Sequence, residues 1–287
     1  MERVPIIKSH EPDPYSDDIL QVNPSLLTEW LTAFLQDEIV RRRGFDKAVV
    51  GLSGGVDSSL AAFLLAKTLG PRNVVGIRMP YQTSSPESLE HAELVSKATG
   101  ICMETIPITE AVEGYLKYAP EADSRRKGNV MARTRMIILF DQSQKLGALP
   151  VGTGNKTERL FGYFTWHADD SPPVNPLGDL FKTQVWQLAI FLGVPDVIVK
   201  KPATADLVQG QTDEGDFGIS YPVADRILFY LLRGFLPERL VELGFKLEEV
   251  TLVKRRLDTT HWKRRLPTTA MLSSTSINDY YLRPVDY

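Results

Sequence analysis

A glycine- and serine-rich segment, residues 51–59, contains the residue types that a phosphate-binding loop needs. It reads Gly-Leu-Ser-Gly-Gly-Val-Asp-Ser-Ser and lies between a predicted strand and a predicted helix. Two adjacent glycines let the backbone approach an anion closely, and the free N–H groups at the start of the next helix favour phosphate. The hydroxyls of Ser53 and Ser58 add donors, and Asp57 offers a hard oxygen ligand for Mg²⁺.

The same residue types also suit an ordinary strand-to-helix turn with a serine N-cap. The segment lacks the Gly-Lys-Ser/Thr of a Walker A loop and the spacing of a Gly-x-Gly-x-x-Gly fingerprint. A single Gly-Gly pair would favour the plain turn. The complete Ser-Gly-Gly-Val-Asp-Ser string in this position favours a phosphate loop.

Short apolar runs alternate with helical patterns around this loop. We expect strands at 48–52, 74–77, 102–106 and 149–152, and helices at 23–39, 60–69, 88–99 and 129–145. Such alternation is typical of a parallel sheet covered by helices on both faces. Beyond about residue 210 the helical pattern continues without a clear strand. The sequence therefore predicts an α/β fold: a single domain with a parallel five-stranded or similar sheet flanked by helices, and a helical C-terminal part.

Composition limits the partners and the cellular location that this domain can have. The 287 residues include 33 Lys+Arg and 36 Asp+Glu, and this near-neutral balance argues against bulk nucleic-acid binding. No apolar stretch approaches the roughly 18 residues of a membrane helix, and the N-terminus lacks the form of a signal peptide. The one cysteine, Cys102, excludes an internal disulfide, and we expect it to be buried in a core strand. A cytoplasmic location is predicted.

The loop at residues 51–59 resembles that of the N-type ATP pyrophosphatases, which cleave ATP to AMP and pyrophosphate. Further segments resemble, in the same order, those of one branch of this superfamily, the ammonia-dependent NAD synthetases. They are Lys127–Met136, Val151–Glu158, Asn175–Val185, Thr204–Leu207, Asp213–Glu214, Gly218–Tyr221 and His261–Pro267. The resemblance thus covers about residues 25 to 270. We expect an extended arm at 1–22, the synthetase-like domain at 23–270 and a tail at 271–287.

The resemblance implies an adenine nucleotide alpha hydrolase-like fold and ATP-dependent amidation of deamido-NAD by ammonia. The reaction passes through an adenylated carboxylate and releases AMP and pyrophosphate. By this resemblance, the residues that contact ATP are Gly51, Leu52, Ser53, Gly54, Gly55, Val56, Asp57, Ser58, Arg78, Thr153, Lys182 and Thr204. The implied catalytic residues are Asp57, Glu158, Lys182 and Asp169, of which Asp57 and Glu158 hold Mg²⁺.

Two of these positions also have a physical interpretation of their own. Glu158 lies about one helical turn beyond a predicted strand end, and Mg²⁺ prefers one or two carboxylates plus substrate phosphates. Lys182 lies at a predicted helix start, where the helix dipole disfavours a cation, so a phosphate partner would explain it. The plain alternatives are a solvated glutamate and a lysine that reaches into water.

The side that would bind the second substrate departs from the family pattern. Arg133, Trp166 and Lys263 fall at positions that the resemblance associates with deamido-NAD, and Asp169 at one near the ammonia site. A carboxylate there could hold NH₄⁺ and accept a proton. However, Trp166 stands where many members have Lys, and Pro173 where an Asp follows. A tryptophan could still stack on a pyridine or adenine ring.

The resemblance further implies a homodimer, with the Lys263 segment near the partner. Ammonia would be free or would come from a separate glutaminase subunit, because the chain has no room for an amidase domain. The expected partners are therefore small molecules, with neither nucleic acid nor membrane. Two other functions remain open: a sulfur transferase or amidase of the same superfamily that acts on another substrate, and an ATP sensor without turnover.

Overall fold

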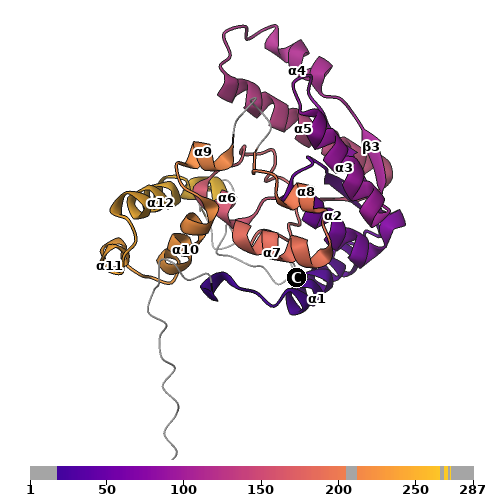
Figure 1. Ribbon diagram of the computed structural model, residues 1–287. Helices are drawn as coiled ribbons and strands as arrows, with labels where there is room; N and C mark the ends of the chain where they lie inside the picture. Colours follow the sequence, from indigo (N-terminus) through magenta and orange to yellow (C-terminus); the bar gives the residue numbers. More distant parts are fainter. Residues whose placement is uncertain (1–17, 205–211, 266–267, 271, 273–287) are drawn as a thin grey trace, which may run out of the picture.

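The computed structural model describes residues 18–204, 212–265, 268–270 and 272 (Figure 1). Its sheet contains β1 (Ala48–Gly51), β2 (Val74–Arg78), β3 (Cys102–Thr105) and β4 (Leu149–Val151). The strand order is β3-β2-β1-β4, and every pair is parallel. The predicted α/β architecture is confirmed, with four strands in the described residues. Val174 adds one parallel bridge to Val151 beyond the β4 edge.

The side chains of β1 alternate between two cores, one on each face of the sheet. Ala48 and Val50 belong to the core under α2 (Val56–Leu69), whereas Val49 packs with Leu139 of α5 (Ser124–Leu146) on the other face. Both faces are thus apolar, as the continuous hydrophobic run of this strand predicts. The α2 face is covered further by α1 (Pro24–Leu35), α3 (Pro86–Thr99) and α7 (Lys182–Leu192).

A second core joins the C-terminal helices. Besides α7, the helices that follow β4 are α6 (Lys156–Phe161), α8 (Asp196–Val199), α9 (Asp213–Phe217), α10 (Tyr221–Leu231), α11 (Pro237–Glu242) and α12 (Leu247–Thr259). Phe161, Phe217, Leu228 and Val253 are buried together in this core. Short helical turns lie at Asp18–Leu20, Gln36–Arg41, Pro71–Asn73 and His261–Arg264. The predicted helical C-terminal part is therefore present.

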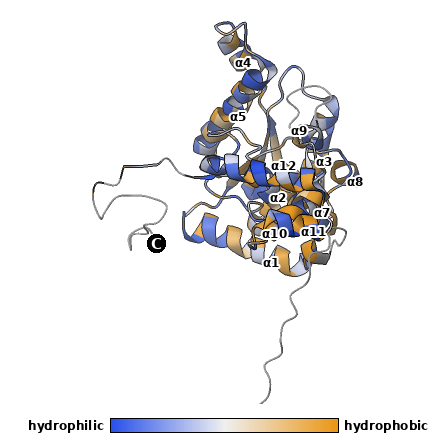
Figure 2. Cartoon of the chain, turned by 90° about the vertical axis from the view of Figure 1, so that its left-hand side faces the viewer, coloured by the Kyte–Doolittle hydropathy of each residue, from blue (hydrophilic) through white to orange (hydrophobic). Residues whose placement is uncertain are grey.

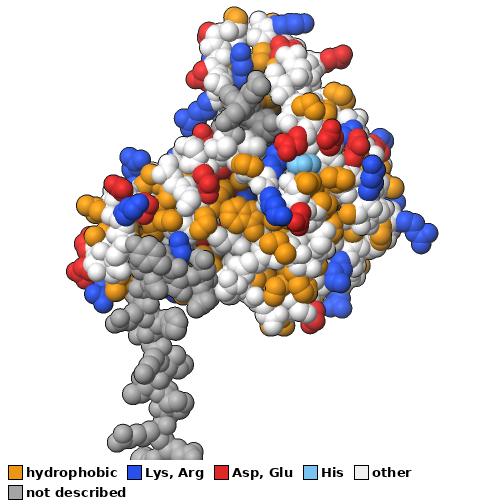
Figure 3. Space-filling view, in the orientation of Figure 1, with side chains coloured by type: hydrophobic (Ala, Val, Ile, Leu, Met, Phe, Trp, Pro, Cys, Tyr) orange, Lys and Arg blue, Asp and Glu red, His pale blue; other side chains and the backbone are white. Residues whose placement is uncertain are grey.

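The helix α4 (Thr109–Leu116) and the first turns of α5 project from the body of the molecule in both views (Figures 1 and 2). They share a small core of their own, which includes Val112 and Met131. Elsewhere, exposed apolar side chains gather over α1 and α7 (Figure 3), among them Trp30 and Ile190. Within the described part of the chain, no helix is long and apolar enough to cross a membrane.

The prediction that Cys102 is buried was wrong. The strand is present, but Cys102 is the first residue of β3, which is an edge strand, and its side chain is exposed. Because the strands are parallel, Cys102 lies at the amino end of the sheet, opposite the loops that follow β1 and β4. It is therefore remote from the phosphate loop.

Candidate active site

The strand order brings the predicted site residues together. The chain proceeds outward from β1 to β2 and β3 on one side, while β4 lies on the other side of β1. Open parallel sheets bind ligands beyond the carboxyl ends of their strands, at the point where the order reverses. The loop at 52–55 follows β1 and the segment 152–158 follows β4, so both lie at this point.

The phosphate loop is held in shape by its own serines. Ser58 Oγ lies 3.0 Å from Ser53 Oγ and donates to the carbonyl oxygen of Gly55 at 3.1 Å. Gly54 has φ +78°, and a Cβ there would lie 2.2 Å from the carbonyl oxygen of Ser88 in α3. Glycine is thus required here both by conformation and by space.

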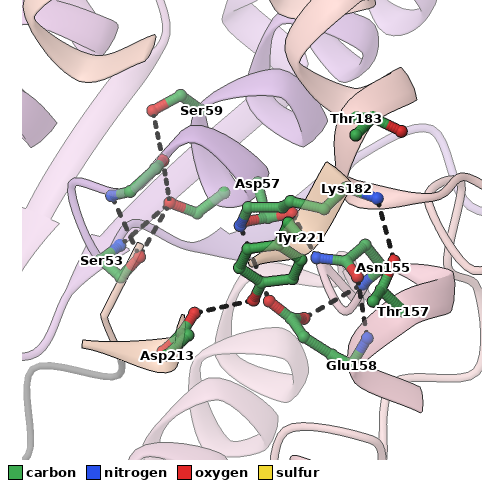
Figure 4. A network of polar contacts seen from close by, with 12 residues as sticks. Ser53, Asp57, Ser59, Asn155, Thr157, Glu158, Lys182, Thr183, Asp213 and Tyr221 are labelled. Carbon is green, nitrogen blue, oxygen red and sulfur yellow. Dashed lines mark hydrogen bonds and ion pairs between the residues drawn. The ribbon is translucent and has the colours of Figure 1, made fainter. Parts of the chain in front are cut away.

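Three charged side chains converge beside this loop. The Lys182 ammonium, at the first residue of α7, forms an ion pair with Asp57 and lies 3.7 Å from Glu158 Oε1 (Figure 4). Asn155 Nδ2 donates to the other oxygen of Asp57 at 2.9 Å. The segments after β1 and β4 and the start of α7 therefore meet through direct polar contacts.

The position of Glu158 follows from local helix capping. Asn155 and Glu158 form a capping box: the Asn155 side chain accepts from Glu158 N–H at 3.0 Å, and Glu158 Oε2 accepts from Asn155 N–H at 3.2 Å. This arrangement leaves Glu158 Oε1 directed toward Lys182. Glu158 lies in the first turn of α6, the helix that follows β4.

Burial controls the electrostatics of this group. Burial raises the pKa of Glu158 to about 8, and the nearby Asp57 carboxylate adds to the effect. Burial alone would lower the pKa of Lys182, but Asp57 and Glu158 outweigh it and raise that pKa. The side chain of Lys182 is only 2% exposed. The lysine therefore remains a cation paired with the Asp57 carboxylate, whereas a pKa of about 8 leaves Glu158 mostly protonated at neutral pH.

Asp57 and Glu158 suit a magnesium ion that is shared with a phosphate group. Their carboxylates lie close enough for one ammonium to contact both, and Mg²⁺ commonly takes one or two carboxylates plus phosphate oxygens. In the described residues, no three His, Cys, Asp or Glu side chains gather to hold a metal without such help. The donor set therefore fits Mg²⁺ that arrives with a nucleotide.

Three further residues predicted to contact ATP are Arg78, Thr153 and Thr204. Arg78 ends β2, and its guanidinium contacts Glu93 at 3.0 Å and Thr105 Oγ1 at 3.1 Å. Thr153 is half-buried in the loop after β4. Thr204 is also half-buried and is the last residue described before position 212, so the remainder of its motif, 205–207, lies outside the described residues.

The residues assigned to the second substrate form a separate group. Arg133, exposed on α5, donates to the carbonyl oxygen of Trp166 at 3.1 Å. The Trp166 ring lies 5.2 Å from that of Trp262 in an edge-to-face contact. The Lys263 ammonium donates to the backbone carbonyls of residues 162 and 164. These contacts join the loop after α6, α5 and the segment after α12.

Asp169 lies in the same loop as Trp166. Its Oδ1 accepts from the N–H of Thr165 at 2.9 Å. The residue as a whole is exposed, yet the protein packed around its carboxyl group raises the pKa to about 6. A carboxyl group with this pKa is mostly ionised at neutral pH and can still exchange a proton.

Several buried residues that hold this site together had no role predicted from the sequence. Thr157, Asp213, Tyr221 and Asp225 are all buried, and they connect α6, α7, α9 and α10. One signal was available, because Asp225 interrupts the apolar run of α10 with a charge. A buried carboxylate in such a helix needs several hydrogen-bond donors. The donors, Thr157 and Thr183, are far from Asp225 in the sequence, so they could not be identified from it.

The parallel sheet, the phosphate loop at its switch point and the paired carboxylates define a nucleotide-binding protein of the adenine nucleotide alpha hydrolase-like fold. The model of the NAD synthase family matches residues 27–267. The chain therefore belongs to the NAD synthase family.

Individual relatives agree with this assignment. The NH₃-dependent NAD⁺ synthetase of Trichlorobacter lovleyi is 46% identical over 261 residues, which cover 90% of this chain and 95% of the relative. That of Fusobacterium nucleatum is 44% identical over 254 residues, or 88% and 98% of the two chains.

Two solved structures are similar along nearly their whole length. The NMN synthetase of Francisella tularensis has a TM-score of 0.77 at 29% identity and covers 87% of this chain and 99% of its own. The NH₃-dependent NAD synthetase of Campylobacter jejuni, in complex with nitrate, has a TM-score of 0.75 at 28% identity. The match covers 87% of this chain and 100% of that structure's chain.

Burial also raises the pKa of Asp225 to about 6, which leads to a stability prediction. Because the unfolded pKa is lower, the folded state holds this proton more tightly, and the free energy of unfolding falls as pH rises through the folded pKa. Between pH 5 and 7 we expect wild type to lose about 1–2 kcal/mol relative to Asp225→Asn, which does not titrate there. Denaturant unfolding at several pH values measures this difference. Parallel curves for the two proteins would contradict it.

Proposed function

We propose that this protein is a ligase that converts deamido-NAD to NAD, with ATP as the energy source and ammonia as the nitrogen donor, and that it acts in the cytoplasm. The observation that carries the proposal is the group of Asp57, Glu158 and Lys182 beside a phosphate loop, in a chain of the NAD synthase family. Family membership favours this reaction over a sulfur transferase of the same superfamily.

In the first step, ATP lies on the loop at 51–58, with Lys182 on its phosphates. Asp57 and Glu158 would hold Mg²⁺, which when bound neutralises phosphate charge. The nicotinate carboxylate attacks the α-phosphorus and forms an acyl-adenylate, while the bond to pyrophosphate breaks. Adenylation is needed because a carboxylate oxygen is a poor leaving group. Fixed charges at the site stabilise the charge that develops on the phosphates.

In the second step, ammonia attacks the activated carbonyl, AMP leaves, and the amide of NAD is formed. Asp169 would bind NH₄⁺ and accept its proton, so that neutral NH₃ is the nucleophile. Its pKa of about 6 suits this role near neutral pH. Arg133, Trp166 and Lys263 are proposed to contact deamido-NAD. The ring of Trp166 would stack on a flat base of the substrate.

A product assay tests the proposal directly. With ATP, Mg²⁺, deamido-NAD and ammonium, we expect NAD and AMP in equal amounts, with NAD measured by enzymatic reduction and AMP by chromatography. Nicotinate mononucleotide is tested in parallel, because a similar solved structure is an NMN synthetase. AMP formed only with another acceptor would change the substrate, and binding of ATP without any AMP would support a sensor.

Replacing Asp57 by Asn removes the charge while keeping the size of the side chain. We expect kcat to fall at least about a hundredfold, because the site loses a charged ligand for the Mg²⁺ that would neutralise phosphate charge. Steady-state kinetics measure this fall, and Asp179→Asn is the matched control because Asp179 is 94% exposed. An unchanged kcat in Asp57→Asn, with only weaker ATP binding, would contradict the catalytic role.

We also propose a homodimer that uses the exposed face of α5. Ile137 is 62% exposed and Phe140 is 37% exposed, and both lie on the helix face that carries Arg133. Exposed apolar side chains beside a proposed substrate contact support an interface there.

Ile137→Lys should convert this dimer to a monomer, because a lysine in the centre of an apolar interface must be desolvated. Size-exclusion chromatography with light scattering measures the mass. Ile190→Lys is the matched control, because Ile190 is 63% exposed on α7, away from α5. Dissociation by the control alone would move the interface to α7, and a monomeric wild type would refute the dimer.

A further inference from the structure

Two side chains of α10 pack against the start of α7, where Lys182 lies. Tyr221 and Asp225 are four residues apart on this helix, so they lie on one face of it. Both are fully buried. Each contacts Lys182 or the residues next to it, although neither belongs to the group of charges proposed to bind ATP and Mg²⁺.

Asp225 fixes the backbone beside both catalytic segments. Its Oδ1 accepts from the Thr157 hydroxyl at 2.5 Å, and its Oδ2 accepts from the N–H and the hydroxyl of Thr183 at 3.0 and 2.9 Å. Thr157 Oγ1 in turn accepts from the N–H of Lys182 at 3.0 Å. Because Thr157 precedes Glu158 and Thr183 follows Lys182, one carboxylate holds α6 and α7 in register.

Tyr221 contacts the ammonium end of the Lys182 side chain. The Lys182 ammonium lies over the Tyr221 ring, 5.2 Å from its centre (Figure 4). The Tyr221 hydroxyl donates to Asp213 Oδ2 at 2.9 Å, and its N–H donates to Glu214 Oε1 at 2.7 Å. The ring is therefore fixed at both ends and offers its negative face to the cation.

Lys182 needs such support for a physical reason. Its ammonium is carried by a flexible four-carbon chain, and the N-terminal end of a helix disfavours a cation. Catalysis by positioned charges loses rate steeply when a group moves by about 1 Å. We infer that Tyr221 and Asp225 are positioning residues that hold Lys182, and through Thr157 also Glu158, where the reaction needs them. The inference rests on the proposed function for the reaction that it serves.

A double-mutant cycle with Lys182 tests this inference. Asp225→Ala removes all three hydrogen bonds and should lower kcat about a hundredfold, whereas Asp225→Asn keeps an acceptor for Thr183 and should recover about tenfold of that. In a Lys182→Gln background, Asp225→Ala should lower kcat further by less than about threefold, because the ammonium that Asp225 helps to position is gone. Equal factors in both backgrounds would show a merely structural role and overturn the inference.

Tyrosine variants provide a second test that does not depend on Asp225. Tyr221→Phe keeps the ring and loses one hydrogen bond, whereas Tyr221→Leu loses the ring, so kcat should fall more in the leucine variant. Equal losses would contradict a role for the ring. Ser96→Ala is the control, because Ser96 Oγ donates to the carbonyl oxygen of Ile101, far from this site, and it should change kcat less than about twofold.

The affinity for MgATP is measured by calorimetry in the same variants. If wild type binds ATP but forms no NAD, the proposed function fails, while coupling between Asp225 and Lys182 remains measurable as a non-additive change in Kd. If wild type forms NAD and the changes are additive, the inference fails alone. Circular dichroism and thermal melting show which variants are folded, and an unfolded Asp225→Ala is replaced in the cycle by Asp225→Asn.

Discussion

The buried ammonium of Lys182 between the carboxylates of Asp57 and Glu158 is the interaction on which the rest of the site depends. A cation that is 2% exposed is tolerated only where opposite charges and oriented dipoles replace water. Asp57 comes from the helix after β1, Glu158 from the helix after β4, and Lys182 from α7. The need to neutralise one charge therefore ties together three segments that no local interaction would unite.

The sheet provides the frame for this contact. β1 is buried on both faces and flanked by β2 and β4, so the loops that follow β1 and β4 emerge side by side. Glycine at position 54 then lets the phosphate loop lie directly against α3, and the capping box at Asn155 sets the direction of Glu158. Each of these local features is common in proteins. They form a site here because the strand order places the loops after β1 and β4 side by side.

Much of this architecture could be predicted from sequence, because its signals are local. The apolar run at 48–52 and the glycine pair each depend on a few neighbouring residues. The expected strand is present at Ala48–Gly51, whereas the helix after the loop begins at Val56, before the expected residue 60. The resemblance to the family added Glu158 and Lys182. Cys102 was misplaced because an apolar strand pattern does not reveal whether the strand lies at the edge of the sheet.

The supporting residues were missed for a different reason. Asp225 bonds to Thr157 across 68 positions and to Thr183 across 42, and no periodic pattern encodes such pairs. Arg78 and Trp166 show a related limit: the sequence identifies the residue types, whereas their partners, Glu93 and Trp262, depend on how α3 and the segment after α12 pack.

The wide spacing of the site residues along the chain has a consequence for folding. Asp57, Glu158, Lys182 and Tyr221 span most of the described chain, so no short fragment can contain the complete phosphate site. Contacts between such distant positions require long loops to close, which costs chain entropy. A nucleotide that binds only the finished site stabilises the folded chain as a whole. The ability to bind it thus depends on all of these segments being docked together.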